Sequence, residues 1–349
     1  MKVAILFDGL SALGPTPDLL ILDTIEAVER ALAAADLTTV RVPVNPDARW
    51  VERLRRGKFD LAFNLCEGID GMAEREPAVI GALELLGLPY TGSSCATTSL
   101  ALRKHVVNAV LGGAGLPVPP WQLSRPGALA VPSDFPVICK PAAEDASVGI
   151  EQRSVVRSSR ALVARLRLMH QVWDEILVQR FIDGREINVG ILGNDVLPVA
   201  EIDFGAMPKR MWRIVSYRSK WKPGSDEDLG AVPRCPADLP SELTTEVQRI
   251  ALDAWRVVGG AGYGRIDMRI DTDGRPWILE VNANPDIAPD AGLARMARAA
   301  GMDYVAMLAV VCEHAVAVPK TSSPATWELA ERLSGVAPTL LDAVAGGQR

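Results

Sequence analysis

Four polar side chains alternate with apolar ones in the stretch YGRIDMRIDTDGRPWILEVNANPD, residues 263–286. The Asp-Gly pair at its centre is typical of a two-residue hairpin turn, because type I′ turns need positive φ at both positions. Such a turn pairs Asp267 with Glu280. It also pairs Arg265 with Asn282, and the alternation of side chains along strands puts all four on one face. The other face is expected to carry the apolar residues Ile266, Met268, Ile270, Leu279 and Val281.

Two carboxylates that lie directly opposite each other on a sheet repel. A divalent cation between Asp267 and Glu280 would make this arrangement favourable. Mg²⁺ takes oxygen ligands and is usually held by one or two carboxylates together with substrate phosphates, and Asn282 adds an amide oxygen. The alternative is an ordinary half-buried hairpin whose polar face meets water. The pattern favours a Mg²⁺–nucleotide site with Arg265 beside it.

The chain before this hairpin begins with an α/β pattern. Strand and helix patterns alternate over the first hundred residues, which predicts a parallel sheet covered by helices. An α+β unit follows, in which an apolar strand ends at Lys140. Residues 207–232 form a long polar loop, of the kind that often serves as a lid. Strands are predicted at 2–7, 38–44, 59–65 and 135–141, and residues 175–192 are expected to form two strands joined by a linker. Helices are predicted at 23–36, 74–89, 100–113, 158–174, 239–259 and 290–317.

The composition excludes several classes of protein. The chain has 349 residues and a net charge of −6, so no overall basic field points to nucleic acid. No apolar run approaches the roughly 18 residues that span a membrane. Five cysteines without a Cys-x-x-Cys pair, and no signal peptide, predict a reduced protein of the cytoplasm. Fingerprints of P-loop, Gly-x-Gly-x-x-Gly and Gly-x-Ser-x-Gly proteins are absent from the sequence.

Six segments, taken in order, resemble the ATP-grasp superfamily and within it the D-alanine–D-alanine ligases. They are LGLPYTGSS, LRKHVVNAVLGGAGLPVP, FPVICKP…SVGI, ILVQRFIDGREINVGIL, YGRID and LEVNANPD. The resemblance covers roughly residues 1–315. It implies the ATP-grasp fold, α/β and α+β, with an N-terminal Rossmann-like parallel-sheet domain at 1–103. A central lid subdomain at 104–184, a catalytic domain at 185–316 and a tail at 317–349 would follow.

The resemblance also implies a reaction. ATP phosphorylates a carboxylate, and an amine then attacks the acyl phosphate and displaces phosphate. Arg265 and Lys220 would stabilise the reacting groups. Mg²⁺, or Mn²⁺ in its place, would be held by Asp267, Glu280 and Asn282. The residues assigned to ATP are Lys104, Lys140, Ser147, Gln179, Arg180, Ile182 and Glu186.

The departures from the family fall on the substrate side. Family ligases usually have Glu near the position of Leu13, Ser at Ala146 and Tyr at Trp221, which together close over the amino-acid site. Leu and Ala carry no polar side chain, and an indole only donates. A family Ser near Ala291 is also missing. The substrate half of the site is therefore expected to differ from that of the family.

Two further departures leave alternatives open. Asp286 replaces a usual Gly, and it either pairs with a substrate amine or caps a following helix that begins at residues 288–291. Gln179 replaces a Glu that contacts adenine, and its carbonyl oxygen still accepts a hydrogen bond. On the lid, Tyr217 and Arg218 either meet the substrate, as Trp221 is expected to, or lie in a solvated loop.

These observations predict an ATP-dependent carboxylate–amine ligase that joins amino acids or small peptides. Housekeeping D-alanyl-D-alanine synthesis is not expected to be its reaction. One alternative keeps the acyl phosphate but uses a hydroxyl group, or an amine of the same molecule, as the nucleophile. Another is a non-catalytic ATP-binding protein. The expected partners are small-molecule amino acids or peptides, with neither nucleic acid nor membrane, and a homodimer of the kind that the family often forms.

Overall fold

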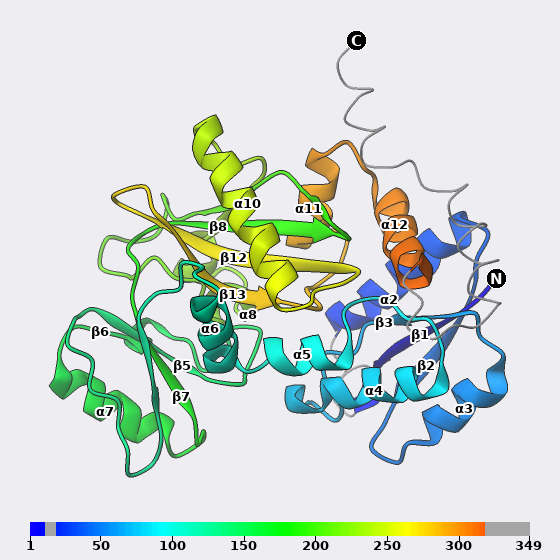
Figure 1. Ribbon diagram of the computed structural model, residues 1–349, viewed down its shortest axis with the longest axis horizontal. Coiled ribbons are helices and arrows are strands. Elements are labelled where there is room, and N and C mark those ends of the chain that lie inside the picture. The colour runs from blue at the N-terminus through cyan, green and yellow to red at the C-terminus, as the bar shows by residue number, and fades with distance from the viewer. Residues whose placement is uncertain (11–18, 318–349) are drawn as a thin grey trace.

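The computed structural model describes residues 1–10 and 19–317, and their strands form three separate sheets (Figure 1). Leu13, and the predicted tail beyond Ala317, lie outside the described residues. The first sheet is at one end of the molecule and the other two are at the opposite end, with α5 (Cys95–Ala101) between them (Figure 1).

The first sheet is parallel, with the strand order β2-β1-β3. Alternate residues of β1 face opposite sides: Val3, Ile5 and Phe7 pack in one core cluster, and Ala4 and Leu6 in another. Helices cover both faces, as a parallel sheet requires. Its elements are β1 (Lys2–Asp8), β2 (Thr38–Val44), β3 (Leu61–Asn64), α2 (Leu19–Ala34), α3 (Arg49–Gly57), η1 (Ala73–Arg75), α4 (Glu76–Leu86) and, from the far end of the chain, α12 (Tyr304–Ala317).

The predicted helix over 100–113 is wrong in one respect, because two helices meet there. α5 (Cys95–Ala101) is followed by its C-cap Leu102, and α6 (Lys104–Gly113) begins two residues after that cap. The break lets the Lys104 N–H donate to the Ala142 carbonyl at 2.9 Å. This contact joins the start of α6 to the loop that follows β5 (Val137–Pro141) in the second sheet.

The second sheet is antiparallel, in the order β4-β7-β5-β6, and α7 packs on it through an apolar cluster that includes Leu162, Leu166 and Met169. α7 begins at a Ser158 cap, whose hydroxyl accepts the Ala161 N–H. The bounds are β4 (Trp121–Ser124), β5 (Val137–Pro141), η2 (Gln152–Ser154), β6 (Val155–Val156), α7 (Ser159–Met169) and β7 (Ile176–Arg180).

The third sheet has the order β11-β10-β8-β12-β13, with β9 beside β8. One face packs against α10 and α6, and the other carries the polar residues of the predicted site. The bounds are β8 (Gly184–Leu192), β9 (Asp195–Val196), β10 (Ala200–Asp203), β11 (Val232–Arg234), α10 (Ser241–Val257), β12 (Tyr263–Asp271), β13 (Pro276–Asn282) and α11 (Gly292–Ala299).

The segment 207–232 contains two short helices, α8 (Tyr217–Trp221) and α9 (Asp226–Leu229), where the sequence predicted only a loop.

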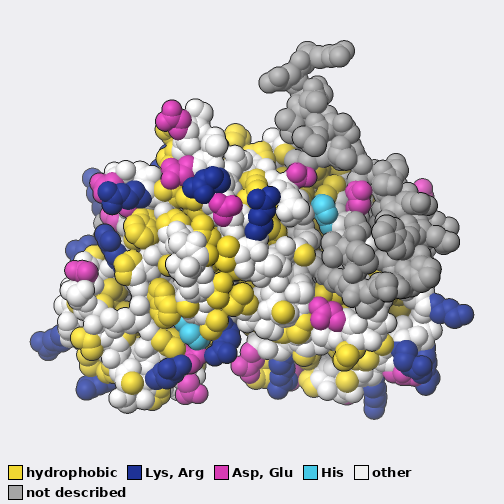
Figure 2. Space-filling view, viewed as in Figure 1, with side chains coloured by type: hydrophobic (Ala, Val, Ile, Leu, Met, Phe, Trp, Pro, Cys, Tyr) yellow, Lys and Arg dark blue, Asp and Glu magenta, His cyan; other side chains and the backbone are white. Residues whose placement is uncertain are grey.

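Among the described residues no single helix is long and apolar enough to cross a membrane. The bent pair α11 and α12 meets that test by length and composition only, and both helices contribute to the buried core. Acidic and basic side chains are interspersed on the face shown in Figure 2.

Candidate active site

The hairpin of β12 and β13 has the predicted pairing at its polar end. Arg265 pairs with Asn282 and Asp267 pairs with Glu280. The predicted two-residue turn is wrong, however. The Asp271 N–H donates to the Arg275 carbonyl at 3.0 Å, so the turn contains three residues, with Gly274 at φ 81°. Three-residue turns with a left-handed residue are the next common hairpin type.

A bulge restores the predicted register. Met268 pairs with Ile278 rather than Leu279, so Leu279 has no partner on β12. The buried face of the hairpin therefore carries Ile278, which is fully buried, in place of Leu279. A bulge adds one residue to one strand, which compensates for the extra residue in the turn.

Asp267 lies at the centre of the polar face. Arg265 donates two hydrogen bonds to its carboxylate, at 2.7 and 2.8 Å. Asn282 and Asn188 each donate one more, at 3.0 and 2.7 Å. Burial lowers the pKa of Arg265, but the Asp267 carboxylate outweighs it and leaves that pKa raised. The guanidinium is thus held charged and in one orientation.

Glu280 faces a buried lysine. Lys104 Nζ lies 2.6 Å from Glu280 Oε1 and 3.0 Å from Asp145 Oδ1, and it also donates to the Glu144 carbonyl. Burial lowers the pKa of Lys104, but the two carboxylates reverse this and leave its pKa raised. For Glu280, burial raises the pKa, and Lys104 with Lys140 outweighs burial and lowers it. The group is therefore a buried lysine paired with two partly exposed carboxylates.

Lys140 projects from β5 beside β7. Its Nζ donates to Gln179 Oε1 at 3.4 Å, and the Gln179 side chain is fully buried. The Gln179 Nε2 group is buried without a hydrogen-bond partner among the described residues. The Gln179 carbonyl oxygen, which was expected to accept a hydrogen bond from adenine, therefore faces Lys140. The unpaired group is the Gln179 Nε2 amide, which is a donor. Burial also lowers the pKa of Lys140.

Arg269 is a buried residue that the sequence analysis missed. Its guanidinium binds the Glu186 carboxylate at 2.7 and 3.1 Å. It also donates to the Ile182 carbonyl at 2.7 Å and to the Arg213 carbonyl. It thereby brings together two residues assigned to ATP and the start of the lid. Arg180 lies nearby at the end of β7, where its N–H donates to the Pro120 carbonyl at 2.8 Å.

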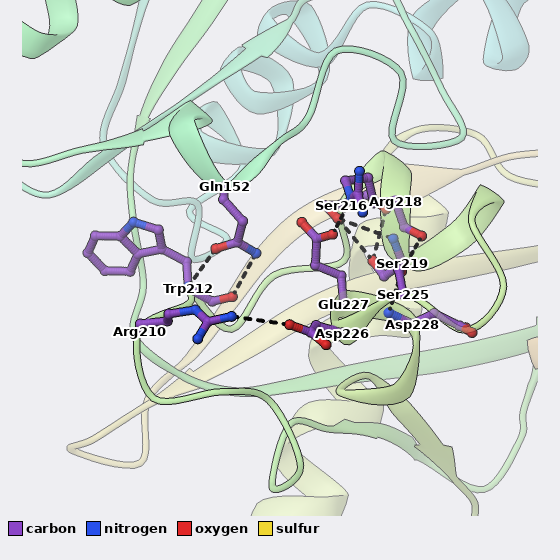
Figure 3. Close-up of polar contacts among 10 residues, drawn as sticks. All are labelled: Gln152, Arg210, Trp212, Ser216, Arg218, Ser219, Ser225, Asp226, Glu227 and Asp228. Atoms are coloured by element: carbon purple, nitrogen blue, oxygen red, sulfur yellow. Dashed lines mark hydrogen bonds and ion pairs between the residues drawn. The ribbon is translucent and has the colours of Figure 1, made fainter.

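Polar contacts hold the lid together, and Gln152 from outside the lid binds the backbone of Trp212 (Figure 3). Arg218 of α8 pairs with Glu227 of α9 at 2.7 Å, and Ser225 caps α9 while its hydroxyl donates to the Arg218 carbonyl. Arg218 thus has a partner inside the lid. Tyr217 and Lys220 are exposed, and neither hydroxyl nor ammonium contacts the hairpin.

The lid meets the turn over 144–150. The Trp221 indole N–H donates to the Ala146 carbonyl at 3.0 Å, and the Ser147 hydroxyl donates to the Val215 carbonyl at 3.1 Å. Both Ala146 and Ser147 have left-handed backbones, at φ 54° and 62°. Such conformations cost energy in residues with a Cβ and persist only when the surroundings hold them. The Trp221 side chain therefore binds the backbone at Ala146. Family ligases usually have Tyr and Ser at these two positions, whose side chains are expected to meet.

Asp286 does not cap a helix at 288–291. Its carboxylate accepts the Ala288 N–H at 2.9 Å, but the helix begins only at Gly292. Asn284, two residues earlier, was missed by the sequence analysis. It donates to the Cys66 carbonyl at 3.1 Å and to Glu76 at 3.0 Å. These bonds join the segment after β13 to the loop after β3 and to the start of α4.

The Glu76 carboxyl gives the fold a pH dependence. Burial raises its pKa from 4.5 to about 8, against the lowering effect of Asn284. Because the folded state favours the protonated form, this contribution to stability is complete below about pH 4.5 and is lost as the pH rises through about 8. We expect Glu76→Gln to reduce that loss, so that at pH 9 the variant is more stable than wild type by roughly 2–4 kcal/mol.

The measurement is the free energy of unfolding by urea at pH 6 and pH 9. The exposed neighbour Glu74, changed to Gln, is the matched control and should follow the wild type. Equal losses of stability in the wild type and in Glu76→Gln would contradict the assignment.

The polar face fits a divalent cation by its chemistry. Asp267 and Glu280 offer carboxylate oxygens and Asn282 an amide oxygen, and Glu280 Oε1 is buried without a well-directed hydrogen bond. The described residues contain no group of three or more His, Cys, Asp or Glu side chains that would enclose a metal by itself. Mg²⁺ typically binds one or two carboxylates, and substrate phosphates complete its coordination shell.

Comparison with known proteins identifies the fold. The family model for the D-ala D-ala ligase C-terminus matches residues 111–313. Crystal structures of the D-alanine–D-alanine ligase from Bacillus anthracis, one complexed with ATP, superpose with TM-scores of 0.74 and 0.73 at 22% and 23% identity, and cover 92% of this chain and 99% of that one. The chain is thus an ATP-grasp enzyme, of the class of ligases that form C–N bonds and release ADP.

Proteins of similar sequence show to which family the chain belongs. The D-alanine–D-alanine ligase of Geotalea uraniireducens is 33% identical over 307 residues, which cover 87% of this chain and 92% of that protein. The enzyme of the same name from Bordetella petrii is 35% identical over 288 residues, covering 79% and 82%. The chain belongs to the D-alanine–D-alanine ligase family.

Proposed function

We propose that the protein joins the carboxylate of one amino acid or small peptide to the amine of another, through an acyl phosphate made with ATP. The supporting observation is the polar face of the β12–β13 hairpin. It sets Arg265, Asp267 and Glu280 beside the buried Lys104. A carboxylate is a poor electrophile, and phosphorylation gives it a leaving group.

ATP would lie between the second and third sheets. Lys104 and Lys140 are cations on the side of Glu280, suited to phosphate oxygens. The Bacillus anthracis relative of the same fold was solved with ATP, which supports a nucleotide here. Carboxylate oxygens hold the Lys104 ammonium in the described structure. We infer that the ammonium exchanges these partners for phosphate oxygens when the nucleotide binds.

The base and ribose would meet the residues around β7 and β8. Gln179 presents a buried, unpaired amide donor. The backbone of Arg180 and Ile182 would face the base, and Ser147 the phosphates. Glu186, held by its bond from Arg269, would accept from the ribose hydroxyls.

Asp267, Glu280 and Asn282 would hold Mg²⁺ or Mn²⁺, which when bound neutralises phosphate charge. The chain's own contribution is electrostatic and positional. Arg265, fixed by its two bonds to Asp267, would face the negative charge that develops as the acyl phosphate forms and breaks down. Lys220 on the lid would face the transferred phosphoryl group. Preorganised charges of this kind are usually the largest catalytic contribution.

The substrate is proposed to differ from two molecules of D-alanine. Named relatives are D-alanine–D-alanine ligases, so D-alanine is the first compound to test. Leu13, Ala146 and Ala291 lack the polar groups that the family uses, however, and the Trp221 N–H is already bonded to a backbone carbonyl. A pocket without partners for polar substrate groups selects against that substrate.

The test is Mg²⁺-dependent phosphate release from ATP with D- and L-amino acids, singly and in pairs, with mass spectrometry of the products. The expected result is turnover and a product whose mass is the sum of two acids less water. A product of one acid less water would indicate ring closure instead. D-alanine alone, giving its dipeptide efficiently, would overturn the proposed change of substrate, and ATP binding without phosphate release would overturn the ligase function.

A cytoplasmic location and a homodimer formed through the N-terminal domain remain part of the proposal. The first follows from the use of ATP and from five cysteines that are all free. The second follows from the family alone, and sedimentation of the full chain would test it.

A further inference from the structure

Glu67 is an acidic residue near the proposed reaction site that the sequence analysis did not select. It lies three positions after β3, at the carboxyl end of the parallel sheet, where α/β proteins bind ligands. Its neighbours Cys66 and Gly68 are buried, whereas the Glu67 side chain is exposed. The loop therefore presents this one carboxylate from an otherwise buried segment.

The loop that carries Glu67 is anchored on two sides. The Asp8 carboxylate accepts the backbone N–H groups of residues 70–71 at 3.0 and 2.8 Å. The Cys66 carbonyl accepts a hydrogen bond from the Asn284 side chain at 3.1 Å. The position of Glu67 relative to the segment after β13 is thus fixed by its immediate neighbours.

The charges that act on Glu67 are those of the proposed site. Desolvation by the surrounding protein has the largest effect and raises the pKa of Glu67 to about 7. Lys220 and Arg265 lower that pKa, while Asp286 and Asp145 raise it. Because the side chain is also exposed, solvent screens part of these effects.

Hydrogen bonds and ion pairs bring the same groups to the hairpin. Asn284, which follows β13, binds the Cys66 carbonyl next to Glu67. Trp221, next to Lys220, binds the carbonyl of the residue after Asp145, and Lys104 joins Asp145 to Glu280 of the hairpin.

Glu67 makes no hydrogen bond or ion pair with any described residue, and the Lys220 ammonium likewise has no ion-pair partner among them. In contrast, Arg265 is paired with Asp267, and Asp145 with Lys104. An unpaired carboxylate and an unpaired ammonium in the same surroundings are complementary to a molecule that carries both charges. A free amino acid is such a molecule.

We propose that Glu67 binds the ammonium group of the amino acid whose carboxylate is activated, while Lys220 and Arg265 face its carboxylate end. This inference rests on the proposed ligase function. Leu13, where the family usually has a carboxylate, cannot supply the charge. Asp286 stands in the same surroundings, but one of its oxygens is already used by the Ala288 N–H. Glu67 is therefore assigned as a determinant of specificity for an acid that bears an amine.

The test uses hydroxylamine as the nucleophile, so that a single amino acid suffices. Its nitrogen attacks the acyl phosphate carbon, the bond to the phosphate oxygen breaks, and a hydroxamate and phosphate are released. The amino acid is the D- or L-form that the wild type converts best, and its analogue without the amine is the comparison (propanoate for alanine). We expect Glu67→Gln to raise KM for the amino acid about 10- to 100-fold, with KM for ATP changed less than about two-fold.

The preference for the amino acid over its amine-free analogue should fall by a similar factor, which a merely structural role would not produce. Asp70→Asn removes one exposed charge from the same loop and is the matched control. Thermal unfolding confirms that both variants fold. If Glu67→Gln behaves like Asp70→Asn while the wild type forms hydroxamate, the inference is wrong and the ligase function stands. If the wild type forms no hydroxamate with any amino acid, both are overturned.

Discussion

Replacing Glu280 by Gln should reduce ligation roughly 10²- to 10³-fold, the cost of removing one preorganised charged group from such a site. Glu280 lies opposite Asp267 and 2.6 Å from Lys104. The amide keeps the shape but removes the negative charge on which both the proposed cation and the neighbouring lysines depend. The half-saturating Mg²⁺ concentration should rise together with the loss of turnover.

Phosphate release at varied Mg²⁺, with the best amino acid of the panel, measures this change. Calorimetric titration with Mg²⁺ and ATP gives a second measurement that needs no amino acid. Asp273→Asn, the same chemical change at the exposed tip of the same hairpin, is the matched control and should leave both measurements unchanged. Wild-type turnover and Mg²⁺ dependence in Glu280→Gln would remove Glu280 from the metal site.

The hairpin shows how far local sequence rules reach. They predicted the pairing of Asp267 with Glu280 correctly, although the turn was assigned one residue too short. The bulge at Leu279 cancelled that error. The pairing was derived from the turn, and it holds because the bulge offsets the extra turn residue. A turn rule contains no information about a bulge farther along the strand, whereas the alternation of side chains, which assigned the four polar residues to one face, does not depend on the length of the turn.

The contacts missed by sequence reasoning all join distant segments. Arg269 meets the carbonyl of Arg213, 56 positions away, and Asn284 meets Glu76 across 208 positions. Neither residue has an unusual local pattern: Arg269 is one more polar residue on an alternating strand. The signal that was available is chemical, because an arginine on a strand between buried apolar residues needs partners for its five donors.

Glu67 was missed for a different reason. The sequence shows an acidic residue in a loop, and most such residues are simply solvated. Its interest comes from the absence of a partner among the described residues, together with Lys220 and Arg265 nearby. An absence of this kind is a property of the folded chain and has no counterpart in the order of residues.

The second large effect is expected at Arg269, whose replacement by Met should destabilise the fold by roughly 3–5 kcal/mol, because the Glu186 carboxylate would remain with its charge unpaired. Arg269 is only 2% exposed, and its guanidinium also binds the carbonyls of Ile182 and Arg213. It lies 5.0 Å from the centre of the Phe181 ring as well. Methionine fills part of the volume but satisfies none of these acceptors.

Urea unfolding measures the loss. Arg185→Met is the matched control, because Arg185 also pairs with a glutamate from the same sheet but has a side chain 39% exposed. Solvent around the guanidinium screens this pair, so its loss should cost less, about 1 kcal/mol. Adding Glu186→Gln to Arg269→Met should recover part of the stability, since the unpaired charge is then gone. A loss below about 1 kcal/mol in Arg269→Met, or a double variant no more stable than the single one, would show that the burial of Arg269 is compensated elsewhere.

If Glu186 and Ile182 hold the nucleotide as proposed, KM for ATP should rise in Arg269→Met and stay unchanged in Arg185→Met. The same pair of variants therefore tests both the stability of this part of the fold and its role in binding.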